Sequence, residues 1–373
     1  MTDKELVLEL LQAGLWGHKV MLAKNPQNWP EIFNIVQQQS VVGVTFSAVQ
    51  TLPPEQRPEM GMKMNWLGSV YVVELHNKQV DNDVVSLFNY LQTKGVALRL
   101  MKGQGCAYFY PHPHYRQSGD IDLFVGEKQY EQAKKLIRNH GVKIEKESVY
   151  DVQFTWGETI VEMHKWETFF YYPLVNRRLQ AICRKEEWNK SIVVNIGGQP
   201  IALFNATFNA FYIFVHLYHH FLQVGIGLRQ ICDWMLWMKH QEVYIDWERL
   251  HRYVQEIDAE RAWKAFYGLT AEHLGLRLTV VPKWMQQYSQ KDVDFILEDV
   301  FSVGNFGKYG DSIQKRSFGG GFLANIASFG ALTKRLIRVS RFGPCEVVSY
   351  PLWRIFCDRA MFSRYLAPKD VKV

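Results

Sequence analysis

The segment RQSGDIDLFV, residues 116–125, is the most informative stretch of this chain because it places two aspartates inside an otherwise apolar strand pattern. On a β-strand the side chains of residues i and i+2 point to the same face. We therefore expect Asp120 and Asp122 side by side, with Ile121 and Leu123 on the opposite face. Two neighbouring carboxylates repel each other unless a cation or a proton lies between them. The segment predicts either a cation site or, as the alternative, solvated charges or helix caps at an exposed strand end.

A glycine-containing turn precedes this strand. LRLMKGQG, residues 98–105, is typical of a short strand that ends in Lys102, Gly103 and Gln104 and then enters an apolar helix. Such a turn presents backbone N–H groups and the positive end of a helix dipole, which suit phosphate. Lys102 would add a point charge. Many strand-to-helix turns contain glycine, so this turn indicates a phosphate site only in combination with the neighbouring motifs.

A second polar pair follows on a later strand. In IVEMHKW, residues 160–166, Glu162 and His164 again lie at i and i+2. A third carboxylate beside Asp120 and Asp122 would complete a cage for two divalent cations and assist deprotonation of an attacking hydroxyl group. The alternative is an exposed strand glutamate and an ordinary surface histidine.

Two arginines extend the candidate site. Arg116 precedes Asp120 by four residues, where it either reaches a bound triphosphate or pairs with the aspartates. Arg229 and Asp233 lie at i and i+4 of an expected helix. They form either an exposed ion pair of little energetic value or a fixed group that faces the site.

Three histidines in HLYHHF, residues 216–221, share one face of another expected helix. Their spacing is one that zinc sites use, but no nearby carboxylate completes such a site. We expect these histidines to make polar contacts in the cleft or to pack in the core.

The pattern of apolar residues divides the chain into three regions. Residues 1–95 and 205–373 show mostly helical spacing, and residues 96–204 show short strands with one helix between them. A segment rich in glycine and charge at 306–322 is expected to be a loop. Within the central region the strands are expected at 96–101, 121–125, 142–150 and 159–165, the helix at 127–141 and a hairpin turn at 195–200.

Composition sets limits on the protein class. The 373 residues are 47% hydrophobic, which indicates a packed globular chain. Five cysteines without a CxxC pair favour reduced thiols and a cytoplasmic location. The N-terminus has the pattern of an amphipathic helix and not of a signal peptide, and no apolar run has the length of a membrane span.

The net charge of +6 is concentrated in the C-terminal tail, residues 331–373, which contains nine lysines or arginines and three acids. Within it, residues 332–343 alternate basic and apolar residues as an amphipathic helix does. A solvated helix face is the default interpretation, and peripheral contact with a membrane or with an anionic acceptor is the alternative.

The order of these motifs resembles the nucleotidyltransferase fold of the DNA polymerase beta superfamily. More narrowly, LMKGQGCAYFYPHPHYRQSGDIDLFV, VEMHKW and HHFLQVGIGLRQICDW look like the family of uncharacterised nucleotidyltransferases. The resemblance implies an α+β fold: a nucleotidyltransferase-like mixed sheet with helices, flanked by N-terminal and C-terminal helical regions. It departs from the wider superfamily at Gln104, where serine is common.

This resemblance implies a function and a set of roles. Asp120, Asp122 and Glu162 would be the catalytic and metal-binding residues, holding Mg²⁺ or Mn²⁺. Lys102, Gly103, Gln104, Arg116 and Arg229 would bind the nucleotide, with His164 and Asp233 also in the cleft. The substrates would be an NTP, ATP in the first place, and an unknown hydroxyl-bearing acceptor other than nucleic acid. The NMP would be transferred and pyrophosphate released.

Two other functions remain open from the sequence. One is a nucleotide-binding or toxin-antitoxin-like module without turnover, which the Gln104 departure favours. The other is a glycosyltransferase that uses its Asp-x-Asp motif to hold a sugar nucleotide. The glycine turn and the third acid at Glu162 argue against the glycosyltransferase.

Overall fold

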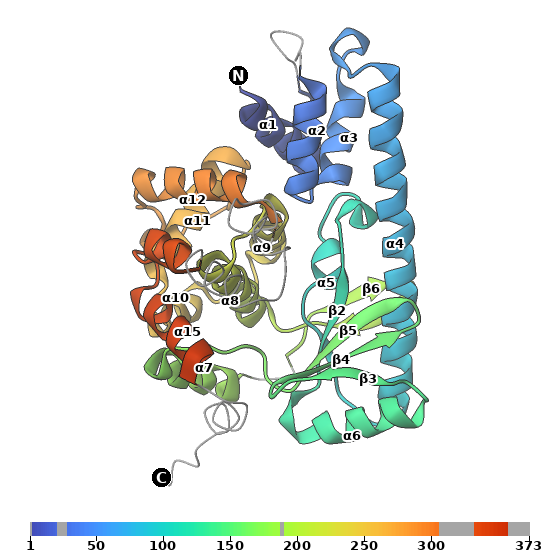
Figure 1. Cartoon of the computed structure of the whole chain (residues 1–373), viewed down its shortest axis with the longest axis vertical. Coiled ribbons are helices and arrows are strands. Elements are labelled where there is room, and N and C mark those ends of the chain that lie inside the picture. The colour runs from blue at the N-terminus through green and yellow to red at the C-terminus, as the bar shows by residue number, and fades with distance from the viewer. Residues whose placement is uncertain (1, 21–27, 187–189, 306–331, 357–373) are drawn as a thin grey trace.

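The computed structural model describes residues 2–20, 28–186, 190–305 and 332–356. It is an α+β structure in which N-terminal helices lie at one end of the molecule and C-terminal helices lie beside a five-stranded mixed sheet (Figure 1). The expected fold class is thus confirmed.

The described residues of the N-terminal region form four α-helices, of which the last is by far the longest. α4 runs along one edge of the molecule from the other N-terminal helices to the sheet (Figure 1), and it ends before Gly95, which adopts a positive φ of 80°. The sequence pattern identified only the last third of this helix. The helices are α1 (Asp3–Trp16), α2 (Trp29–Gln38), α3 (Val42–Thr51) and α4 (Met60–Thr93), with a 3₁₀ turn η1 (Pro54–Gln56).

The central sheet has the strand order β1-β2-β5-β4-β3. β2 and β5 run parallel, and the other neighbouring pairs are antiparallel. The parallel register sets Asp122 beside Glu162, while Ile121 and Leu123 are buried on the opposite face of β2. The strands are β1 (Arg99–Leu100), β2 (Asp120–Phe124), β3 (Ile144–Glu147), β4 (Asp151–Trp156) and β5 (Thr159–His164).

The sequence missed two elements of the central region and placed two others imprecisely. The expected strand at 142–150 ends at Glu147, because the chain reverses where the backbone N–H of Ser148 donates to the Asp151 carbonyl. β4 follows and was not expected, nor was α7 (Pro173–Lys185); the strand at 96–101 is only two residues long. The remaining elements are α5 (Gln104–Ala107), η2 (Pro113–Tyr115), α6 (Gly126–Asn139) and a separate hairpin of β6 (Val193–Ile196) and β7 (Gln199–Ala202).

The C-terminal region is helical, as expected. α8 is buried on nearly all sides, which explains its apolar sequence. The division into regions at 95/96 and 204/205 stays a prediction. The helices are α8 (Ala206–Gln223), α9 (Leu228–Gln241), α10 (Trp247–Glu256), α11 (Glu260–His273), α12 (Gln290–Val303) and α15 (Pro344–Phe356), with η3 (Lys283–Met285) and a helical stretch at 332–339.

The basic stretch at 332–343 packs against α12. The Arg335 guanidinium donates to both carboxylate oxygens of the fully buried Asp299 at 2.7 and 2.8 Å. Arg341 lies 3.5 Å from Asp292. Part of the tail's positive charge is therefore neutralised inside the protein. The expected loop at 306–322 lies outside the described residues.

Two further expectations concern cysteines and membranes. Cys106, Cys183, Cys232 and Cys345 are free thiols. Among the described residues there is no helix with the length and apolar character needed to cross a bilayer.

Candidate active site

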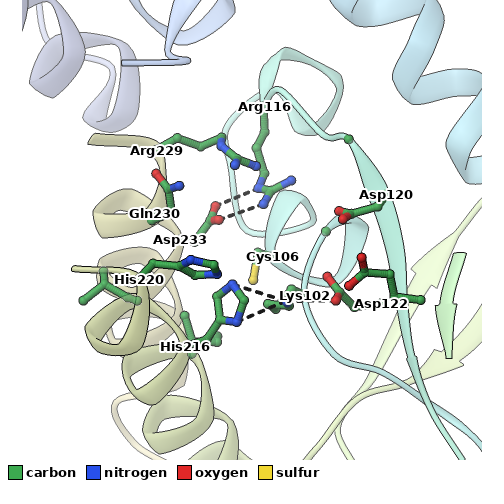
Figure 2. A pocket seen from close by; sticks show the side chains of 15 residues that line it. Lys102, Cys106, Arg116, Asp120, Asp122, His216, His220, Arg229, Gln230 and Asp233 are labelled. Atoms are coloured by element: carbon green, nitrogen blue, oxygen red, sulfur yellow. Dashed lines mark hydrogen bonds and ion pairs between the residues drawn. The ribbon is translucent and has the colours of Figure 1, made fainter. Parts of the chain in front are cut away.

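A pocket opens between the sheet and the helices α8 and α9 (Figure 2). Eight of the ten residues expected at a site line it, and Gln104 and His164 are the exceptions. The eight are Lys102, Gly103, Arg116, Asp120, Asp122, Glu162, Arg229 and Asp233.

Asp120 and Asp122 project from β2 toward the pocket, as the alternation of the strand requires (Figure 2). The negative charge of Asp122, together with burial, raises the pKa of Asp120. Burial by itself would also raise the pKa of Asp122, but Lys102 and His164 outweigh it and hold that pKa below its usual range. As the pH rises, the Asp122 carboxyl therefore ionises before that of Asp120.

Glu162 and His164 reach the same place from β5 because the two strands are parallel and in register. His164 Nε2 lies 3.2 Å from Asp122 Oδ1 and 4.0 Å from Glu162 Oε2. Burial and the neighbouring Asp122 raise the pKa of Glu162. Donor atoms of Asp122, Glu162 and His164 all lie within 4.8 Å of one another, an arrangement that fits one divalent cation.

Lys102 supplies the positive charge closest to the aspartates. Its Nζ lies 2.9 Å from Asp122 Oδ1, and the side chain is 15% exposed. The same ammonium group lies 3.3 Å from the His216 ring nitrogens on α8. Lys102 therefore bridges the strand that carries the acids and the helix on the opposite wall.

Gly103 shapes the turn that follows. Its φ is +55°, a conformation that glycine adopts without strain. A Cβ at this position would lie 3.3 Å from the Asp120 carbonyl oxygen. The turn is thus held close to the start of β2.

The side chain of Gln104 points away from the pocket. Its Nε2 donates to Asp81 Oδ1 on α4 at 2.6 Å, and its Oε1 accepts from Ser118 Oγ at 2.6 Å. The side chain is therefore committed to fixing the turn against α4. A grip on triphosphate by this amide, which the sequence suggested, does not fit these contacts.

Arg116 and Asp233 form a buried bidentate ion pair. Arg116 Nε and Nη2 donate to the two Asp233 oxygens, each at 2.7 Å (Figure 2). The Tyr110 hydroxyl donates to the same carboxylate. The expectations that Arg116 pairs with the aspartates of β2, and that Asp233 has Arg229 as its main partner, are thus corrected. The Arg229 guanidinium donates to the Gln117 carbonyl at 2.9 Å and still lines the pocket.

Two histidines of α8 face the acids across the pocket (Figure 2). Burial and the nearby Lys102 lower the pKa of His216 well below its usual value and that of His220 to about 4. Both rings are therefore neutral at pH 7. His219 instead packs among Phe169, Phe170 and Tyr171, so the three histidines do not converge on one zinc ion.

The contributions of α4 were not foreseen from the sequence. Asn77 Nδ2 donates to the carbonyl groups of His114 and Arg116, each at 2.8 Å. Asp81 Oδ2 lies 2.7 Å from His114 Nε2. The signal in the sequence was that Asn77 and Asp81 lie four positions apart, and therefore on one face of a helix.

A comparison with known protein families identifies the class of the chain. The family model described as uncharacterised nucleotidyltransferase matches residues 25–275. The chain belongs to this family, and it is therefore an enzyme of the nucleotidyltransferase class.

A solution structure of the antibiotic-resistance factor ANT(2'')-Ia is similar with a TM-score of 0.34 and 11% identity, over 53% of this chain and 97% of that chain. No curated protein sequence matches the chain.

Proposed function

We propose that this protein transfers an NMP from an NTP, with ATP as the first candidate, to a hydroxyl group of an acceptor other than nucleic acid. The observation that carries the proposal is the convergence of Asp120, Asp122 and Glu162 on a pocket that also contains Lys102 and Gly103. A cytoplasmic location is proposed with it.

The acidic residues would hold Mg²⁺ or Mn²⁺, because their oxygen atoms are the ligands that these ions prefer. A bound divalent cation would supply charge neutralisation at the phosphates. In such reactions most of the rate enhancement comes from positioning the reactants and neutralising their charge, and the protein takes little part in the covalent chemistry.

The residues of the chain then have separate tasks. Lys102 and Arg229 offer positive charge to the triphosphate, and the Gly103 turn brings backbone N–H groups near it. Arg116 contributes mainly by fixing Asp233 at the pocket wall. The acceptor oxygen attacks the α-phosphorus, the bond to pyrophosphate breaks, and Glu162 is placed to accept the hydroxyl proton.

The first prediction concerns Asp122→Asn. We expect the rate of nucleotidyl transfer to fall at least about 10²–10³-fold, because the ionised carboxylate at the centre of the site is lost. The assay follows pyrophosphate release with each labelled NTP, Mg²⁺ or Mn²⁺ and cell-extract acceptors, and circular dichroism checks the fold.

Glu158→Gln is the matched control, since this carboxyl is exposed on the turn between β4 and β5. It should leave the rate unchanged. Nucleotidyl transfer retained by Asp122→Asn would contradict the proposal. NTP binding without turnover by the unmodified protein would favour the alternative of an inactive nucleotide-binding module.

A further inference from the structure

We propose that His164 is a direct metal ligand, and that its nitrogen makes the site prefer Mn²⁺ over Mg²⁺. This inference rests on the proposed function only for the location of the metal site. Family resemblance assigns the metal to three carboxylates, whereas the geometry brings Asp122, Glu162 and His164 together.

The imidazole ring has no other polar task among the described residues. His164 is 4% exposed, and its Nδ1 is buried without a hydrogen-bond partner in that part of the chain. Its Nε2 faces the two carboxylates. Buried polar groups normally have hydrogen-bond partners. The polar partners of this ring are the two carboxylates of the site.

The separations between the donor atoms match shared coordination. Two ligands held at about 2.1 Å from one ion lie about 3 Å apart at a right angle and about 4.2 Å apart when opposite. The observed separations from Nε2, 3.2 Å to Asp122 Oδ1 and 4.0 Å to Glu162 Oε2, fall within that range. One ion can thus bridge Nε2 to each carboxylate. Holding all three donor atoms, which lie within 4.8 Å of one another, requires the Lys102 ammonium, 2.9 Å from Asp122 Oδ1, to move aside and the two carboxylates to close in on the ion.

The donor set determines which ions fit. Carboxylate oxygens suit Mg²⁺ and Mn²⁺ alike, whereas an imidazole nitrogen favours first-row transition ions over Mg²⁺. A site of two carboxylates and one imidazole therefore prefers Mn²⁺ over Mg²⁺, and the imidazole of His164 is the ligand that produces this preference.

The test uses Mn²⁺ alone, without nucleotide, on the full chain. Electron spin-echo spectroscopy of the bound Mn²⁺ should show coupling to ¹⁴N, and protein labelled with ¹⁵N-histidine should show ¹⁵N coupling in its place. Because this labelling changes no residue, the measurement does not depend on a variant that folds.

Variants then identify the histidine. His164→Gln should lose the nitrogen coupling and bind Mn²⁺ about tenfold more weakly, with little change in Mg²⁺ affinity. The matched control is His240→Gln, at an exposed histidine outside the pocket, and it should keep both properties.

Three results would overturn the inference: no Mn²⁺ binding, bound Mn²⁺ without nitrogen coupling, or coupling that persists in His164→Gln. Bound Mn²⁺ without coupling would make His164 a positioning residue for Asp122. A protein that shows the coupling but transfers no nucleotide would refute the proposed function and leave the ligand assignment intact.

Discussion

The ion pair between Arg116 and Asp233 is a buried, bidentate contact in the pocket wall. Both side chains are almost fully buried, at 3% and 9% exposure. Burying two charges is costly, and only good geometry with further hydrogen bonds offsets the cost. Here the pair is bidentate, and Ser118 and Tyr110 supply the additional bonds.

Removing one partner should therefore be severe. We expect Arg116→Ala to lower the free energy of unfolding by about 3–5 kcal/mol, because Asp233 would remain buried without its counter-charge. Urea denaturation measures the change. Arg178→Ala is the control, since Arg178 and Asp258 form an exposed pair, and it should cost no more than about 1 kcal/mol. Equal small losses in both variants would contradict this account.

Among the elements, α4 fixes the loops around the pocket. Asn77, Asp81 and Asp83 lie within two turns of this helix, and all three bond to the central region. Their partners are the carbonyl groups of His114 and Arg116, the side chains of Gln104 and His114, and the turn at Glu158 and Thr159.

Gly157 allows a close approach between that turn and α4. A Cβ on Gly157 would lie 2.0 Å from Asp83 Oδ1, whereas a Cβ on Gly141 would meet nothing within 4 Å. Both glycines have positive φ. We expect Gly141→Ala to cost about 1–2 kcal/mol through the backbone alone. Gly157→Ala should cost at least about 1 kcal/mol more, measured by chemical denaturation. Similar losses in the two variants would show that the Asp83 side chain moves away from the added Cβ without a cost in the free energy of unfolding.

The spacing of apolar residues predicted those helices and strands whose periodic pattern lies within one continuous segment. The alternation in β2 and β5 placed Asp120, Asp122 and Glu162 correctly on one face. It did not reveal that Arg116 bonds to Asp233, because 117 positions separate the two and no local period relates them. Gln104 was misjudged for the same reason, since its partner Asp81 belongs to a helix that precedes the turn.

On the scale of the whole molecule, the pocket depends on segments from distant parts of the chain. One wall comes from the sheet and the Gly103 turn, and the other comes from α8 and α9. The C-terminal α15 is tied to the segment after β5, because Glu346 accepts the backbone N–H groups of Tyr171 and Tyr172 at 2.8 and 2.9 Å.

Buried Glu167 should make the stability of the molecule depend on pH. Burial raises its pKa from 4.5 to about 7. Between those values the folded chain binds a proton that the unfolded chain releases, so the free energy of unfolding falls as pH rises. We expect this group to contribute a loss of about 1–3 kcal/mol from pH 5 to pH 8. Glu167→Gln should remove that part of the slope, while the part due to Glu346, whose pKa burial also raises to about 7, remains.

Urea denaturation at several pH values between 5 and 8 measures this slope. Glu158→Gln, at an exposed carboxyl, should keep the slope of the unmodified protein. If Glu167→Gln also keeps it, another group is responsible.

The contact between Lys102 and Asp122 gives this carboxylate a counter-ion within the chain itself. Burial alone would make the Asp122 carboxylate bind a proton more readily, because burial disfavours the charged form. With a covalently attached ammonium group 2.9 Å away, the carboxylate stays charged throughout. Under the proposed function, metal binding would be an exchange of one cation for another, and the displaced ammonium group would then be free to contact the incoming phosphates.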